Sequence, residues 1–131
     1  MTIDKEVGYW REEMEKNLAG ARTVKAGGVL YMTGVTSVDD DGKVVGAGDM
    51  TAQVKQIYST LGKILSKNNL TFEHVVKEVI YVTDGMAFFG ANQIRVDVYK
   101  DLLPPAITAV EVAGLFNPDL VVEIDITAIC S

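Results

Sequence analysis

Residues 50–82 read MTAQVKQIYSTLGKILSKNNLTFEHVVKEVIYV. The apolar side chains of the first half recur mostly at steps of three and four and therefore share one helical face: Met50, Val54, Ile57, Leu61, Ile64 and Leu65. This spacing predicts a helix over residues 50–66, with Asp49 as its N-cap. Residues 75–82 are rich in β-branched side chains and predict a strand covered on both sides for much of its length. A helix followed by a buried strand indicates that helices pack on a sheet.

The sequence on either side of this pair predicts a ββαβαββ order. The further strands are expected at residues 21–25, 29–33, 106–112 and 120–128, and a second helix at residues 84–102. The first two strands should form a hairpin, because two glycines separate them. Residues 1–18 are mixed and charged, with Trp10 and Met14 four positions apart, which predicts a short helix or an arm lying on the body of the protein.

Two helices alternating with strands can cover only one face of a single sheet, so the other face needs cover from elsewhere. On the last strand, that face mixes polar and apolar groups: Val121, Glu123, Asp125 and Thr127. Such a mixture suits a subunit interface containing a cleft better than open solvent. We therefore expect a homo-oligomer whose subunits each form one domain over residues 1–131.

The composition excludes several classes of partner. The net charge is −6, whereas nucleic-acid binding needs a basic face that displaces counterions from phosphates. No apolar run approaches the roughly 20 residues that span a bilayer, and the N-terminus is charged, so we expect no membrane partner and a cytoplasmic location. Cys130 is the single cysteine and His74 the single histidine, so neither a disulfide nor a metal site is expected.

Several motifs, in their order and spacing together, resemble the Rid family, also called YjgF, over residues 20–130. They lie at residues 28–34, 49–53, 74–77, 84, 88–92, 105–106 and 122–125. The resemblance implies an α+β fold similar to chorismate mutase, with one mostly antiparallel sheet and two helices on one face. It also implies a homotrimer with three clefts between neighbouring subunits, and no cofactor.

In the deaminating branch of that family, an arginine directly after Pro-Ala holds the substrate carboxylate in a bidentate clasp. A glutamate in the last strand positions the water that attacks the C=N carbon. By resemblance, Glu123 matches this glutamate, while Thr33 and Asn92 match a serine and an asparagine that shape the pocket. Ile107 occupies the position of the arginine. Its apolar side chain would leave a substrate carboxylate unpaired, so the pocket should favour a less anionic or differently oriented ligand.

Arg11, Arg22 and Arg95 are the arginines that could replace the missing guanidinium, and we favour Arg22 in the first strand. The ordinary role of such a residue is an exposed charge. Ordinary roles also exist for Glu123, as a solvated or interface-pairing carboxylate, for Thr33, as a β-branched strand residue, and for Asn92, as a hydrogen-bonding group at an interface.

The leading hypothesis is an enzyme that hydrolyses the C–N bond of an imine or enamine, such as an aminomuconate-type enamine. Its site would lie between subunits, with Glu123 orienting water. The alternative is a noncatalytic trimer that binds a small metabolite or has a regulatory role. Ribonuclease activity is disfavoured by the acidic charge.

Overall fold

The computed structural model describes residues 2–130; Met1 and Ser131, the ends of the predicted domain, lie outside the described residues. The elements are β1 (Glu6–Gly8), α1 (Glu12–Asn17), β2 (Thr23–Ala26), β3 (Val29–Val35), α2 (Met50–Lys67), the 3₁₀ helix η1 (Phe72–His74), β4 (Val75–Val82), α3 (Gly85–Gly90), α4 (Asn92–Tyr99), β5 (Ala106–Glu111) and β6 (Val122–Ile129). The strands form one sheet in the order β1-β2-β3-β6-β4-β5. The predicted α+β class is confirmed, and the predicted order of main elements is recovered.

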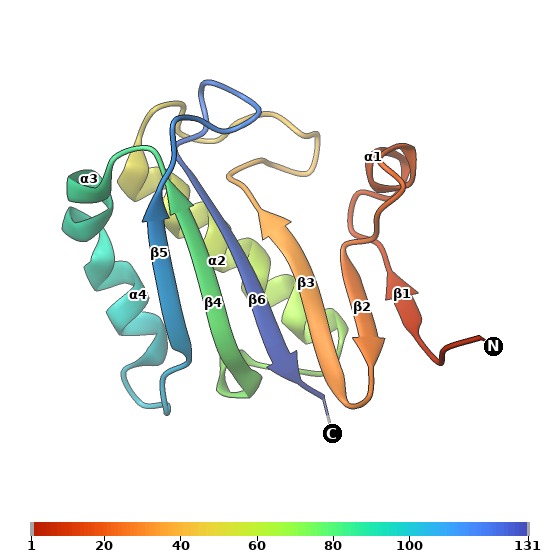
Figure 1. Cartoon of the computed structure of the whole chain (residues 1–131). Coiled ribbons are helices and arrows are strands. Elements are labelled where there is room, and N and C mark those ends of the chain that lie inside the picture. Colours follow the sequence, from red (N-terminus) through yellow and green to blue (C-terminus); the bar gives the residue numbers. More distant parts are fainter. Residues whose placement is uncertain (1, 131) are drawn as a thin grey trace.

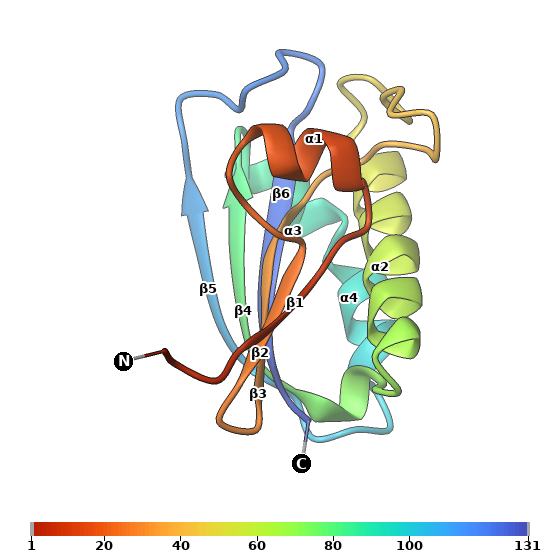
Figure 2. The ribbon, with the colours of Figure 1, turned by 90° about the vertical axis from the view of Figure 1, so that its right-hand side faces the viewer.

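The sheet is mixed, because β4 and β5 run parallel while the other described pairs are antiparallel (Figure 1). Helices α2, α3 and α4 lie on one side of the sheet, and no helix of the described chain covers the opposite side (Figure 2). We call this opposite side the open face. The expectation that β4 is covered on both sides is wrong for the single chain, since its side chains on the open face are only half-buried.

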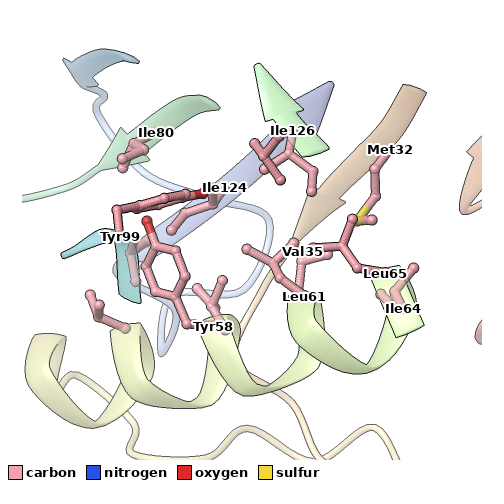
Figure 3. Close-up of a cluster of buried hydrophobic side chains, with 14 of the residues drawn as sticks. Met32, Val35, Tyr58, Leu61, Ile64, Leu65, Ile80, Tyr99, Ile124 and Ile126 are labelled. Carbon is pink, nitrogen blue, oxygen red and sulfur yellow. The ribbon is translucent and has the colours of Figure 1, made fainter. Parts of the chain in front are cut away.

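Helix α2 supplies most of the core. Its N-terminus is capped as predicted, with the Asp49 carboxylate accepting a hydrogen bond from the Ala52 N–H at 3.1 Å. The apolar face of α2 packs on alternate residues of β3, β4 and β6 (Figure 3). The even-numbered residues of β6 point into this core, so Glu123 and Asp125 point to the open face.

A polar cluster lies inside this core. The Glu78 carboxylate, with 0% exposure, accepts hydrogen bonds from the hydroxyls of Tyr58 and Tyr99 and from the Nε of Arg95. The two tyrosines approach each other from α2 and α4 (Figure 3). Burial and the neighbouring carboxylate both raise the pKa of each tyrosine, so both remain protonated donors.

The second helix differs from its prediction. It is divided at Ala91 into α3 and α4, and it ends at Tyr99 rather than at residue 102. Asn92 therefore begins α4 and does not lie inside a continuous helix. Of the two forms predicted for residues 1–18, the short helix is present as α1, and the short strand β1 was not predicted. No helix within residues 2–130 is long and apolar enough to cross a membrane.

Candidate functional site

A β-bulge in β3 shapes the site. Met32 pairs with Ile126 and Val35 pairs with Ile124, so two residues of β3 lie opposite the single residue Asp125. Met32 and Val35 are both buried in the core. Between them lie Thr33 and Gly34, so the bulge accommodates one extra residue away from the core.

Gly34 packs directly on the Glu123 carboxylate. A Cβ added to Gly34 would lie 2.2 Å from Glu123 Oε2, so only glycine leaves room for this side chain. No hydrogen bond joins the Glu123 carboxylate to any group in residues 2–130. Burial raises its pKa, the nearby Asp125 raises it further, and Arg22 opposes the rise. The result is a half-buried carboxylate with free acceptor capacity.

Arg22 holds the backbone of Gly34, on which the Glu123 carboxylate packs. Its Nη1 donates to the Gly34 carbonyl at 3.0 Å, and its Nε donates to Glu15 Oε2 at 2.7 Å. The other oxygen of Glu15 accepts from the backbone N–H groups of Trp10 and Arg11. The expectation that Arg22 is an exposed charge is wrong, because residue and counter-ion are both buried. The guanidinium of Arg22 is thus already committed to the protein.

Two cavities meet at Glu123 and Gly34. The larger, about 790 Å³, is here called the arm pocket; it lies between the N-terminal arm, α2 and the loops after β3 and before β6. Among its lining residues are Trp10, Arg11, Met14, Leu18, Arg22, Val38, Thr60, Lys63, Lys67, Phe116 and Leu120. Figures 1 and 2 show α1 at the edge of the sheet that carries β1 and β2.

The smaller cavity, about 480 Å³, lies on the open face and is here called the sheet hollow. It is lined by Thr33, Gly34, Tyr81, Val112, Gly114, Leu115, Phe116, Glu123 and Asp125. The Tyr81 hydroxyl donates to Asp125 Oδ2 at 3.4 Å, a long contact. Burial raises the pKa of Asp125, and the Asp125 charge raises the pKa of Tyr81. The hollow therefore holds two carboxylates that are harder to ionise than in water.

The structure brings together only some of the predicted site residues. Glu123 and Thr33 share the sheet hollow, and Arg22 reaches Glu123 from the arm pocket. Ile107 lies opposite Glu78 in the parallel register and so points to the helical side of the sheet. Asn92 begins α4 on that same side. Within one described chain, Asn92 and Ile107 therefore do not share a cavity with Glu123.

Sequence reasoning missed two features of the site. Gly34 directly follows the predicted strand 29–33 but lies inside the observed β3, where a glycine is a signal for a bulge or a close approach, and Gly34 provides both. Asp125 and Tyr81 come from different strands and meet only through the β4–β6 register, which local patterns do not specify. Within residues 2–130, no group of three or more His, Cys, Asp or Glu side chains is arranged to hold a metal ion.

The fold and the site together define a class of protein. Its members are α+β subunits in which one face of the sheet is uncovered. A glutamate that packs against a glycine lies between two cavities on that sheet. Residues 19–130 match the family described as Endoribonuclease L-PSP. The chain belongs to this family, and similar solved structures include proteins named as members of the YjgF and Rid families.

Individual relatives agree with this assignment. A RutC family protein of Synechocystis is 31% identical over 82% of this chain and 83% of its own length. The 3-aminoacrylate deaminase RutC of Acinetobacter baylyi is 30% identical over 76% of this chain and 78% of its own length. A Rid family protein of Yersinia pestis, of unknown function, is 26% identical with a TM-score of 0.83, over 96% of this chain and 99% of that one.

Proposed function

We propose that this protein is a hydrolytic deaminase that releases ammonia from an imine or enamine metabolite, with Glu123 orienting the attacking water. The observation that carries the proposal is the Glu123 carboxylate, which is half-buried, makes no hydrogen bond within residues 2–130 and packs against Gly34. A carboxylate whose pKa is raised toward neutrality is a better general base for water than an ordinary one. The relative named 3-aminoacrylate deaminase adds support, because aminoacrylate is an enamine carboxylate.

We propose a homotrimer with the site between subunits. Asn92 and Ile107 lie on the helical side of the sheet, so only a second copy of the chain could place them beside Glu123 and Thr33. The open face, with its mixed polar and apolar side chains, is the surface best suited to this contact. No cofactor is required, since a positioned water and a proton-accepting carboxylate suffice for hydrolysis of a C=N bond.

Ile107 argues for a substrate other than a small α-imino acid. Its side chain is 44% exposed at the edge strand and offers no charge to a carboxylate. A larger enamine of the 2-aminomuconate type fits this loss better, because it has a second carboxylate, farther from the reacting carbon, that can be bound elsewhere. The same apolar residue favours the second candidate function, a noncatalytic trimer that binds a small metabolite.

Ammonia release tests the proposal. The protein should release ammonia from freshly generated 2-aminomuconate faster than the uncatalysed background, and Glu123→Gln should lose most of this rate. Glu73→Gln, which changes an exposed carboxylate elsewhere on the surface, is the matched control. On 2-iminopropionate, the unmodified protein should be inactive and Ile107→Arg should gain activity.

The outcomes separate the candidates. Saturable binding of these compounds without turnover would favour the binding protein. Activity of the unmodified protein on 2-iminopropionate would mean that the argument from Ile107 is wrong. Since burial raises the pKa of Glu123, the acidic limb of the rate profile should also lie above the usual carboxyl value of 4.5.

A further inference from the structure

Arg11 differs from the other two arginines in having no partner for its guanidinium. Arg22 is paired with Glu15, and Arg95 donates to the buried Glu78. The Arg11 guanidinium makes no hydrogen bond and no ion pair with any group in residues 2–130, although its backbone N–H is held by Glu15. A half-buried guanidinium without a counter-ion has donors available for a ligand.

Packing fixes the position of this guanidinium at the arm pocket. It rests against the turn at Gly42, where an added Cβ would lie 2.1 Å from Arg11 Nη2. This turn uses the Asp39 carboxylate internally, because Asp39 Oδ1 accepts from the backbone N–H groups of Asp41 and Lys43. Asp40, also at the pocket, is exposed to solvent. Arg11 therefore lies over a backbone turn rather than in an ion pair.

The arm pocket contains both Arg11 and Glu123, and no ion pair links them. The wall of the pocket also includes the apolar side chains of Met14 and Leu18, and Lys63 and Lys67 add positive charges from α2. Its volume of about 790 Å³ lies within the range of about 300–1,000 Å³ that is typical of small-molecule sites. A three-carbon imino acid would leave most of this space empty.

We propose that Arg11 binds the carboxylate of an elongated ligand whose other end lies at Glu123. This assignment rests on the proposed function for the end at Glu123, and it names the substrate class. The ligand is a carboxylate separated by an unsaturated or aliphatic carbon chain from an imine or enamine carbon. The N-terminal arm, rather than position 107, then selects the substrate, and Arg11 is a specificity-determining residue.

Binding of trans,trans-muconate, a stable dicarboxylate without the amino group, tests the proposal without requiring turnover. Calorimetry with the full chain should show saturable binding at millimolar concentration or below. Arg11→Gln should weaken it by roughly tenfold or more, the loss typical of a charge-assisted contact. Arg11→Lys should recover part of the affinity, and Lys5→Gln, the same charge change on an exposed arm residue, should have no effect.

Each outcome bears on one proposal at a time. Arg11-dependent muconate binding without ammonia release from any substrate supports the role of Arg11 and contradicts the deaminase. Ammonia release from 2-aminomuconate that is insensitive to Arg11→Gln in both KM and kcat supports the deaminase and overturns the role of Arg11. Absence of muconate binding to the unmodified protein, or equal losses in Arg11→Gln and Lys5→Gln, also overturns it.

Discussion

At the scale of single residues, the absence of a side chain at Gly34 is what allows Glu123 to occupy its position. The bulge in β3 turns Gly34 away from the core, and its carbonyl is held by Arg22. The carboxylate then lies where a Cβ would otherwise be. Gly34 thus lies between two functional groups. Its carbonyl is bound by the Arg22 guanidinium, and the carboxylate of Glu123, the proposed base, packs against it.

Gly34→Ala should therefore displace Glu123 while leaving the sheet intact. We expect a destabilisation of about 1–3 kcal/mol, as for other overpacked sites, and loss of most Glu123-dependent ammonia release. Urea unfolding and the ammonia assay measure the two effects. Gly90→Ala is the control, because nothing lies within 4 Å of its added Cβ. Equal turnover in Gly34→Ala and the unmodified protein would contradict this role.

Residue patterns predicted part of this site. Alternation along the last strand correctly separated Glu123 and Asp125 from the core, because strand side chains alternate between faces. The partner of Arg22 was not predictable in the same way. Glu15 lies seven positions earlier, on an arm whose path depends on tertiary packing. An arginine in a strand therefore looked exposed, although it is buried in an ion pair.

At the scale of elements, the buried Glu78 connects three of them. Its carboxylate on β4 receives hydrogen bonds from Tyr58 on α2 and from Tyr99 and Arg95 on α4. Arg95 Nη2 is also buried and has no hydrogen-bond partner in the described chain. The negative charge of Glu78 is thus the main compensation for the positive charge of the largely buried Arg95 guanidinium.

Replacing Glu78 by Gln should remove this compensation. We expect a loss of about 3–5 kcal/mol in the free energy of unfolding, since an uncompensated buried charge remains. Tyr58→Phe removes one hydrogen bond to the charged carboxylate and should cost less, about 1.5–3 kcal/mol. Urea denaturation of both variants provides the comparison. A Glu78→Gln variant no less stable than Tyr58→Phe would rule out this account.

The elements themselves were predicted to different degrees. Helix α2 has a long apolar period and an aspartate cap, so its start was predicted at the correct residue and its end within one. The division between α3 and α4 directly follows Gly90, a glycine signal that the apolar periodicity across it outweighed in the prediction. β1 has three residues and depends on pairing with β2, which short-range patterns do not reveal.

At the scale of the whole molecule, one side of the sheet is left without cover. β5 is one of the two edge strands, and all six of its residues are exposed, apolar ones included. Long exposed apolar edges are uncommon in monomers because they invite association. The proposed trimer would cover this surface.

Val110→Lys tests that arrangement. Val110 lies opposite Tyr81 on the open face and is 40% exposed, whereas Val96 on α4 is 45% exposed on the helical side. Light scattering after size exclusion should give three times the 14.2 kDa chain mass for the unmodified protein and for Val96→Lys. Val110→Lys should dissociate into monomers, because a buried lysine ammonium is costly. A trimeric Val110→Lys would show that the open face is not the interface.

The ion pair between Glu15 and Arg22 makes opening of the arm an all-or-none event. Glu15 belongs to the arm, whereas Arg22 binds the backbone of the sheet. Detaching α1 would therefore leave the Arg22 guanidinium beside Gly34 without its counter-ion. Leaving a buried charge without its partner costs about 3–5 kcal/mol, so partly opened forms are rare. The closed arm therefore holds the Gly34 backbone, against which the proposed base packs, in place before any ligand binds.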